Sequence, residues 1–259
     1  MSQKITTEMV KELRDSTGIS VMQCKRALEE AEGDMKKALA ILKKTSSDIA
    51  LKKVNREVKD GTVMIATEAG KAILVSLHCE TDFVSRNEDF MTLLKNLGDI
   101  ALKNGVEEMK EKAKEMIDPI IQKTGENIQL GDAYEISGDV LGNYVHNNKI
   151  AVVVSLEGGN TELGRDIAMH IAAMKPEYLS QDEISDDSRR MIMEIFQKEI
   201  ASVNKPEDIK KKMLEGKLLT YFKEKTLLNQ AFIKNPQESI EELLGKSKAK
   251  IKEVKRCSI

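Results

Sequence analysis

The sequence predicts an α+β protein with an N-terminal three-helix bundle, two repeated α+β subdomains with antiparallel sheets and a projecting helical hairpin. Three observations support this prediction. Short segments with helical periodicity and clear capping residues fill residues 1–44. Two later segments share the order strand, tight turn, strand, helix. Two amphipathic stripes on either side of Asn204-Lys205-Pro206 predict the hairpin.

The bundle is predicted from its helix ends. The expected N-capping residues are Thr6, Ser20 (in a capping box with Gln23) and Asp34. Gly18 and Gly33 are placed to end the first two helices. A polar bridge at residues 45–48 is expected to separate the third helix from an amphipathic stretch that reaches Val58. A bundle this small suits a binding module better than an enzyme.

One methionine of the bundle is predicted to be exposed. At about 100° per residue, the apolar residues of the second helix from Cys24 to Ala31 share one face. Met22 falls roughly 170° from the centre of that face, and Val21 lies on its edge. With Arg14 at the end of the preceding helix, these residues form a candidate recognition patch. The alternative is a lone exposed apolar side chain, which is common on protein surfaces.

The two core repeats are predicted from alternating strands and turn residues. The first has strands near residues 62–66 and 72–76, a turn at Glu68-Ala69-Gly70 and a helix over 87–103. The second has strands at 144–146 and 149–156, a turn at Asn147-Asn148 and a helix over 162–174. We therefore expect a helical bundle with a linker helix at 1–54, and core subdomains at 55–140 and 141–259.

The helical hairpin is expected at residues 183–225, inside the second subdomain, with Pro206 at the first helical position of its second helix. Its apolar stripes are expected to pack mainly on each other. A partner-binding surface on this hairpin is the alternative.

The segment Thr81-Asp82-Phe83-Val84 carries an aromatic residue in a polar connection. It follows a continuous apolar strand at 72–79 and precedes Ser85-Arg86-Asn87-Glu88, which has the form of a capping box. Because only 3% of the residues are aromatic, we expect Phe83 to be needed for packing or for binding. A loop between two rigid elements is a common place for binding residues. The alternative is that Phe83 folds back onto Phe90 or Met91 as a local staple.

Composition argues against several functional classes. Lys and Arg total 41 against 43 Asp and Glu, so no basic field favours a nucleic-acid partner. Apolar runs fall short of a membrane span, and the N-terminus lacks a signal-peptide core. The three cysteines (Cys24, Cys79 and Cys257) are far apart, which favours a reducing compartment. We expect a cytoplasmic protein with neither nucleic acid nor membrane as a partner.

Motifs for covalent catalysis are absent from the sequence. His78, His146 and His170 are scattered, and the adjacent His78 and Cys79 would point to opposite faces of a strand. Gly245-Lys246-Ser247 resembles the end of a phosphate-binding loop, but the position of its first glycine holds isoleucine. We therefore expect no enzyme, no cofactor and no metal site, and a packed core role for His170.

Several segments together resemble bacterial elongation factor Ts. They are Val10-Lys11-Glu12-Leu13-Arg14, Thr17-Gly18, residues 24–31, Gly33-Asp34, Ala38-Leu39, Thr81-Asp82-Phe83-Val84 and residues 170–176. The segments occur in the family's order along essentially the whole chain. The resemblance implies a ubiquitin-associated-like helical bundle followed by two sheet subdomains and a helical hairpin, in agreement with the prediction from the residues.

The resemblance also implies a function and a partner. It implies a guanine nucleotide exchange factor that binds elongation factor Tu in its GDP-bound and nucleotide-free states. The loop at Asp82 and Phe83 would reach beside the partner's magnesium site, with Phe83 wedged into the switch region. By position, Arg14, Val21 and Met22 resemble residues that grip a helix of the partner's nucleotide-binding domain, and His146 resembles a residue near its phosphate-binding side.

Family members commonly continue beyond the final strand, expected here at residues 251–259, so the resemblance carries over no contact that depends on a terminal helix. A non-catalytic adaptor, whose helical bundle binds another protein, is the alternative function. Ubiquitin-like proteins would be partners of that kind. A nucleic-acid adaptor would need a basic face with stacking aromatics, which the near-neutral charge balance disfavours.

Overall fold

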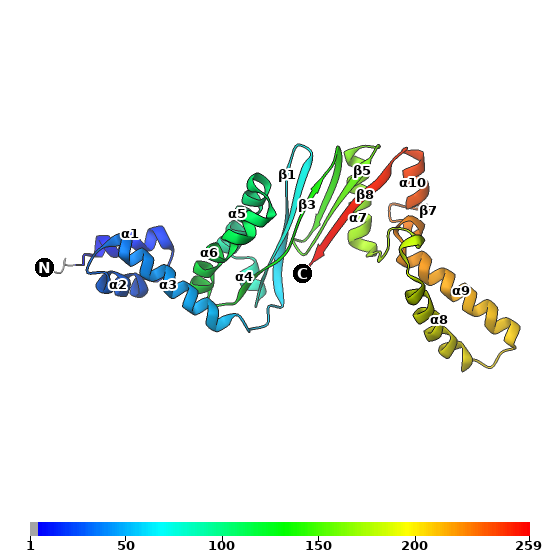
Figure 1. The fold of residues 1–259 in the computed structure, drawn as a ribbon, viewed down its shortest axis with the longest axis horizontal. Coiled ribbons are helices and arrows are strands. Elements are labelled where there is room, and N and C mark those ends of the chain that lie inside the picture. Colours follow the sequence, from blue (N-terminus) through cyan, green and yellow to red (C-terminus); the bar gives the residue numbers. More distant parts are fainter. Residues whose placement is uncertain (1–4) are drawn as a thin grey trace. The chain divides into compact units, whose positions relative to one another are not determined.

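The computed structural model describes residues 5–259, so the first four residues of the predicted bundle lie outside it. The chain forms two compact units. The first contains the chain up to Ser137 together with Val145–Ala151 and Cys257–Ile259. The second contains Gly138–Tyr144 and Val152–Arg256. Figure 1 labels the helices and strands, which are described below one unit at a time.

The first unit begins with three helices, α1 (Thr7–Thr17), α2 (Val21–Glu30) and α3 (Met35–Lys53). The predicted N-caps are confirmed, because the side chains of Thr6, Ser20 and Asp34 each accept a backbone N–H from the following turn. Gly18 ends α1 in the left-handed conformation, with φ 67°. The apolar side chains between the helices form their own core, which includes Leu13, Cys24, Leu28, Ala38 and Leu42.

The predicted polar bridge at residues 45–48 is wrong, because α3 continues through it without a break. The hydroxyls of Thr45 and Ser46 donate to the carbonyl oxygens four residues earlier, which keeps them inside the helix. Ser46 also donates to Gln122, and Ser47 donates to Asp118 at 2.6 Å. These polar residues therefore attach α3 to the neighbouring helix α6 and do not separate two helices.

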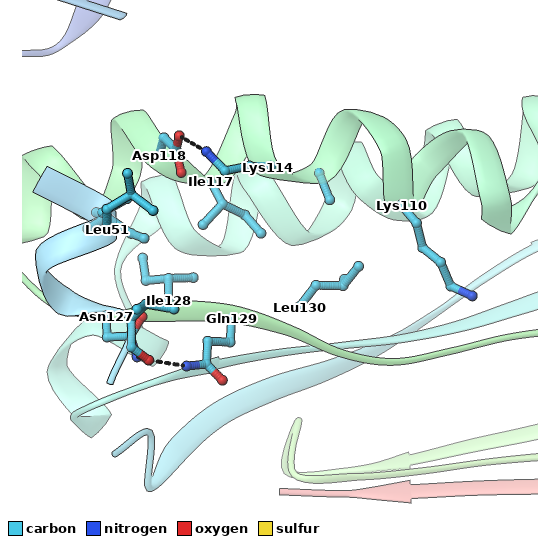
Figure 2. Close-up of a pocket in the computed structure, with 13 residues that line it drawn as sticks. Leu51, Lys110, Lys114, Ile117, Asp118, Asn127, Ile128, Gln129 and Leu130 are labelled. Atoms are coloured by element: carbon cyan, nitrogen blue, oxygen red, sulfur yellow. Dashed lines mark hydrogen bonds and ion pairs between the residues drawn. The ribbon is translucent and has the colours of Figure 1, made fainter. Parts of the chain in front are cut away.

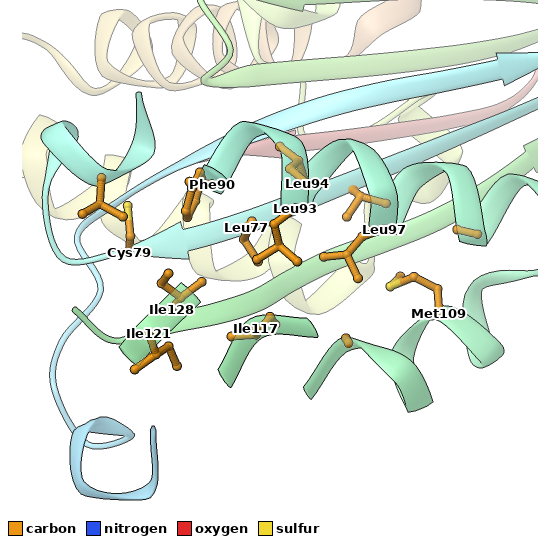
Figure 3. Close-up of a cluster of buried hydrophobic side chains, with 14 of the residues drawn as sticks. Leu77, Cys79, Phe90, Leu93, Leu94, Leu97, Met109, Ile117, Ile121 and Ile128 are labelled. Carbon is orange, nitrogen blue, oxygen red and sulfur yellow. The ribbon is translucent and has the colours of Figure 1, made fainter. Parts of the chain in front are cut away.

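The sheet of the first unit has the order β1-β2-β3, with both neighbouring pairs antiparallel. Its strands are β1 (Asp60–Glu68), β2 (Lys71–Cys79) and β3 (Ile128–Ser137). After the short helix α4 (Asp82–Ser85), the helices α5 (Glu88–Asn104) and α6 (Val106–Thr124) pack on this sheet. Figure 3 shows their shared core, in which Phe90 and Leu97 from α5 meet Ile117 from α6 and Leu77 from β2.

The second unit repeats part of this order. It contains most of the strands β4 (Val140–His146), β5 (Ile150–Glu157) and β8 (Lys250–Ser258), which have the sheet order β4-β5-β8. The turn between β4 and β5, with the adjoining ends of these two strands, and the last residues of β8 belong to the first unit. Helix α7 (Thr161–Met174) follows β5, so the predicted strand, turn, strand, helix order is confirmed in both units. A Cβ atom on Gly142 of β4 would lie 1.9 Å from the carbonyl carbon of Gly164 on α7. The two backbones touch at these glycines, and this contact sets how close α7 lies to the sheet.

The helical hairpin consists of α8 (Asp186–Ala201) and α9 (Glu207–Lys225). The rings of Phe196 and Tyr221 meet edge to face, with centroids 5.6 Å apart. The prediction that the stripes mainly pack on each other holds only in part, because Met191 is 64% exposed and Ile195 is 48% exposed. Pro206 is the N-cap of α9 and Glu207 is its first helical residue, so the helix starts one residue later than predicted.

Short elements complete the second unit. They are the 3-10 turns η1 (Gln181–Glu183) and η2 (Leu227–Asn229), the two-stranded sheet of β6 (Ala231–Phe232) and β7 (Asn235–Ser239), and helix α10 (Ile240–Lys246). Gly245-Lys246-Ser247 lies at the C-terminal end of α10, whereas a phosphate-binding loop precedes the N-terminus of a helix. Within residues 5–259, no helix is long and apolar enough to cross a membrane.

Candidate protein-binding site around Phe83

Phe83 lies on α4, a single helical turn directly after β2, and not on the predicted loop. Val84 and Ser85 of the same turn are buried, whereas the side chain of Phe83 is 85% exposed. The alternative that Phe83 packs on Phe90 or Met91 as a local staple is therefore wrong, and Phe90 fills the core of the first unit without it. An exposed phenylalanine on a turn whose neighbouring residues are buried is a candidate contact residue for a partner protein.

The predicted capping box of Ser85 and Glu88 does not form. Asn87 is the N-cap of α5, and its side-chain oxygen accepts a hydrogen bond from the backbone N–H of Asp89 at 2.9 Å. The hydroxyl of Ser85 instead donates to the carbonyl oxygen of Asp82 at 3.1 Å, inside the turn of α4. The predicted start of the helix is correct to one residue, but a different side chain caps it.

Both ends of α4 are held by neighbouring elements. At its C-terminal end, the hydroxyl of Thr62 on β1 donates to the carbonyl oxygen of Ser85 at 3.0 Å. At its N-terminal end, the backbone N–H of Thr81 donates to the carboxylate of Glu126 at 3.0 Å. The turn that presents Phe83 is therefore attached on one side to β1 and on the other to the connection between α6 and β3.

His146 lies at the tight turn between β4 and β5. Asn147 and Asn148 have φ angles of 50° and 57°, as a two-residue hairpin turn of type I′ requires. The carbonyl oxygen of Asn148 accepts the backbone N–H of Val63 at 2.9 Å, and Lys149 pairs with Asp60. His146 is exposed beside this turn.

The structure thus attaches two of the three predicted groups of site residues to one segment, residues 60–63 of β1. Thr62 holds the Phe83 turn and Val63 holds the His146 turn, and both turns belong to the first unit. The third group lies on different elements, α1 and α2. There Met22 is 60% exposed and Val21 is 49% exposed, as the helical wheel predicted, and Arg14 is exposed near the end of α1.

Burial, nearby charges and hydrogen bonds shift the pKa values of two residues close to α4, Asp60 and Cys79. Burial raises the pKa of Asp60, but hydrogen bonds from Lys149 and from the backbone N–H of Gly61 outweigh it and lower that pKa to about 2. Burial and the nearby carboxylates of Asp60 and Glu126 raise the pKa of the Cys79 thiol to about 12. Cys79 therefore stays a thiol, and its sulfur donates to the carbonyl oxygen of Thr81 at 3.2 Å.

A separate cavity of about 430 Å³ lies between α3, α6 and the beginning of β3. Figure 2 shows Ile117 on α6 facing Ile128 and Leu130 on β3, so the walls are mainly apolar. Its charged residues are ion-paired, with Lys114 3.1 Å from Asp118 and Lys110 2.8 Å from Glu107. The cavity offers a hydrophobic surface without a group of converging reactive side chains.

His170 has the packed core role that was predicted. It is fully buried on α7, where its Nε2 lies 2.9 Å from Oε1 of Gln230 and its Nδ1 accepts the N–H of Ile233 at 3.2 Å. This pattern requires a neutral ring with the proton on Nε2. Among residues 5–259, no group of three or more His, Cys, Asp or Glu side chains is placed to hold a metal ion.

Comparisons with known proteins decide the family. The family model described as elongation factor TS matches residues 80–259, and a curated elongation factor Ts from Hahella chejuensis is 40% identical to the chain. This chain belongs to the elongation factor Ts family. The Hahella alignment covers 95% of this chain and 89% of the relative. Elongation factor Ts from Nitrosospira multiformis is 38% identical over 96% of this chain and 87% of its own, and that from Psychrobacter arcticus is 35% identical over 99% and 90%.

Family membership confirms the resemblance that the sequence segments indicated, and the mixed α+β architecture agrees with it. Sequence reasoning missed the residues that hold the turns of the site, namely Asp60, Thr62, Glu126 and Lys149. Glu126 lies in Gly125-Glu126-Asn127, a polar group between a helix and a strand, and that group is the only local signal it offers.

Proposed function

We propose that this protein is a guanine nucleotide exchange factor for elongation factor Tu in translation elongation. It would promote GDP release by disturbing the partner's magnesium and phosphate site, and it would stabilise the nucleotide-free state. Membership of the elongation factor Ts family supports the activity. The observation that carries the mechanism is the 85% exposure of Phe83 on a turn held at both ends.

Exchange of this kind is a coupling between two binding sites. The factor must bind nucleotide-free elongation factor Tu more tightly than the GDP-bound form. The factor then lowers the affinity of elongation factor Tu for GDP, and GDP lowers its affinity for the factor by the same ratio. Each tenfold loss of GDP affinity requires about 1.4 kcal/mol of differential binding. A buried aromatic at an interface hot spot contributes on the order of 2–4 kcal/mol, so Phe83 can supply a large share but not all of it.

The remaining coupling is assigned to the charged surroundings of Phe83. Magnesium bridges and neutralises the nucleotide phosphates, so any displacement of its ligands weakens nucleotide binding. Asp82 lies next to Phe83 on the same turn, with its carboxylate 3.2 Å from Arg86. His146, on the turn attached to the same part of β1, is assigned to the phosphate side of the partner.

No covalent step is needed, so the protein acts as a binding partner and not as an enzyme of chemical conversion. Its proposed partners are the GDP-bound and nucleotide-free forms of elongation factor Tu. We propose that it binds neither nucleic acid nor a membrane. Because translation elongation takes place in the cytoplasm, we place the activity there. Arg14, Val21 and Met22 are proposed to grip a helix of the partner's nucleotide-binding domain.

The test is stopped-flow release of a fluorescent GDP from elongation factor Tu, with the wild type and with Phe83→Ala. Leu51→Ala is the matched control, because Leu51 is also an exposed apolar residue, at 61%, but belongs to α3 and not to α4. We expect strong acceleration by the wild type and by the control, and a much lower maximal rate with Phe83→Ala. Equal rates for all three proteins would refute the role of Phe83.

No acceleration by the folded wild type would refute the exchange function. The alternative, an adaptor whose helical bundle binds another protein, would then be tested by a pull-down from a bacterial lysate, in which it predicts recovery of a protein other than elongation factor Tu.

A further inference from the structure

We infer that Glu126 is the positioning residue for Phe83, because its carboxylate fixes the backbone from which α4 begins. This inference rests on the proposed function, since it concerns how the exchange site is held in shape. Glu126 lies between α6 and β3, far along the chain from Phe83, and nothing in its local sequence connects the two residues.

The carboxylate of Glu126 accepts three hydrogen bonds from two residues. Its Oε2 atom accepts the backbone N–H of Glu80 at 3.1 Å and that of Thr81 at 3.0 Å. Its Oε1 atom accepts the hydroxyl of Thr81 at 2.6 Å. Thr81 occupies the N-cap position of α4 but makes no side-chain cap, and its hydroxyl is directed to the carboxylate of Glu126. A carboxylate from another element therefore orients the residue from which the turn starts.

The bonds are reciprocal, which fixes the two segments against each other. The carboxylate of Glu80 accepts the backbone N–H of Asn127 at 2.6 Å. The buried side chain of Asn127 donates to the carbonyl oxygen of Arg56 at 2.7 Å, just after α3. Glu126 thus belongs to a connected set of hydrogen bonds, and charged acceptors in such sets form the stronger bonds.

Phe83 depends on this set because its own side chain packs on almost nothing. Its direction follows from the buried Val84 beside it and from the two fixed ends of the turn. If the bonds to Glu126 are lost, α4 keeps its C-terminal attachment through Thr62 but loses its fixed start. Phe83 would then sample more directions, and ordering it on binding would weaken the complex.

The test uses a Glu126→Gln variant, which keeps the size of the side chain but loses the charge and one of its two acceptor oxygens. Phe83→Ala and the double variant complete a double-mutant cycle measured by GDP release. We expect Glu126→Gln to lower the stimulated release by roughly 5- to 20-fold in the wild type, as a loss of preorganisation. In the Phe83→Ala background we expect less than about a twofold further loss, because Glu126 acts through Phe83.

A second readout is independent of the partner. The sequence contains no Trp, so Phe83→Trp introduces a single fluorescent reporter on α4. We expect Glu126→Gln to increase the amplitude of fast local motion of this reporter in time-resolved anisotropy. Glu135→Gln is the matched control, because Glu135 is a carboxylate of β3 paired with Lys71 at 3.1 Å and makes none of the bonds to Glu80 or Thr81. It should leave the anisotropy and the release rate unchanged.

The outcomes separate the inference from the proposed function. If the wild type accelerates release and the two single losses simply multiply in the double variant, Glu126 has only a general structural role and the inference is overturned. Unchanged anisotropy in Glu126→Gln overturns it as well. If the wild type fails to accelerate release, the proposed function fails, and the anisotropy still decides whether Glu126 orders residue 83. Should Glu126→Gln fail to fold, Thr81→Val removes one donor only and should shift both readouts in the same direction.

Discussion

The Nζ atom of Lys149 lies 2.6 Å from Oδ1 of Asp60, and it donates a second hydrogen bond of 2.6 Å to the carbonyl oxygen of Gly61. This pair joins the turn that carries His146 to the beginning of β1. The neighbouring residue Thr62 holds the end of α4. The turn that carries His146 and the helical turn α4 are therefore both attached to one short segment of β1. Loss of the Lys149–Asp60 pair should loosen both.

Asp60 gives the first prediction, a loss of stability in acid. Because the folded-state pKa of Asp60 is lowered from 3.8 to about 2, its contribution is complete above the unfolded-state pKa and is lost as the pH falls from about 4 towards 2. The contribution is at most about 2 kcal/mol. In Lys149→Met the free energy of unfolding should be lower at neutral pH and should change less across this window. Lys71→Met, which removes the pair with Glu135, is the control. Equal acid profiles for wild type and Lys149→Met, measured by urea unfolding, would contradict the prediction.

His170 gives a second pH dependence in a different window. Burial lowers the pKa of His170, and the hydrogen bond to Gln230 opposes this only in part. The unfolded chain therefore binds a proton that the folded chain excludes, and stability should fall as the pH drops through about 6.5 and below. Protonation would also remove the acceptor for the N–H of Ile233.

The test for His170 compares unfolding free energies between pH 8 and 5 for wild type and His170→Asn. The pKa of His78 is also lowered by burial, so the wild type carries two contributions of the same sign. The variant should be less stable at pH 8, and its unfolding free energy should change less steeply with pH than that of the wild type. The difference between the two slopes is the contribution of His170. Parallel slopes would show that His170 does not titrate on unfolding in this range.

The contact between Gly142 and Gly164 gives a prediction about packing. A Cβ on Gly142 would lie 1.9 Å from backbone of Gly164, whereas a Cβ on Gly164 would lie 2.9 Å from backbone of Gly142. Neither backbone can move away cheaply, so Gly142→Ala should destabilise by about 1–3 kcal/mol or more, and Gly164→Ala by less. Gly216→Ala on α9 is the opposite control, because nothing lies within 4 Å of its added methyl group, and it should stabilise by about 0.5–1 kcal/mol. Thermal unfolding of the three variants should give this order.

Local signals predicted much of this fold because they are short-range. Thr6, Ser20 and Asp34 cap their helices within a few residues, and Asn147 and Asn148 form their turn alone. The exposure of Met22 also followed from one helical period. These features need no knowledge of the rest of the chain.

Features that depend on distant contacts were missed. The prediction left out α6 and β3; Pro119 lies inside α6, and the burial of β3 does not alternate cleanly. Residues 45–48 looked like a linker because their partners, Gln122 and Asp118, come from α6. Glu126 is the same case at the site, since its role exists only where it meets Glu80 and Thr81. Polar residues whose partners are far along the chain cannot be interpreted from periodicity.

The last prediction separates the two proposed contact regions of the protein. Met22 is 60% exposed on the bundle, and its burial by a partner would add affinity in every nucleotide state. Such uniform binding changes how much factor is needed but not the rate at saturation, whereas Phe83 is proposed to act on the nucleotide site itself. In a titration of GDP release, Met22→Ala should raise the concentration for half-maximal rate several-fold and leave the maximum unchanged. Leu39→Ala, on α3 and 42% exposed, should change neither value. A lowered maximum with Met22→Ala would place the bundle in the release step, and the division of roles between bundle and turn would have to be abandoned.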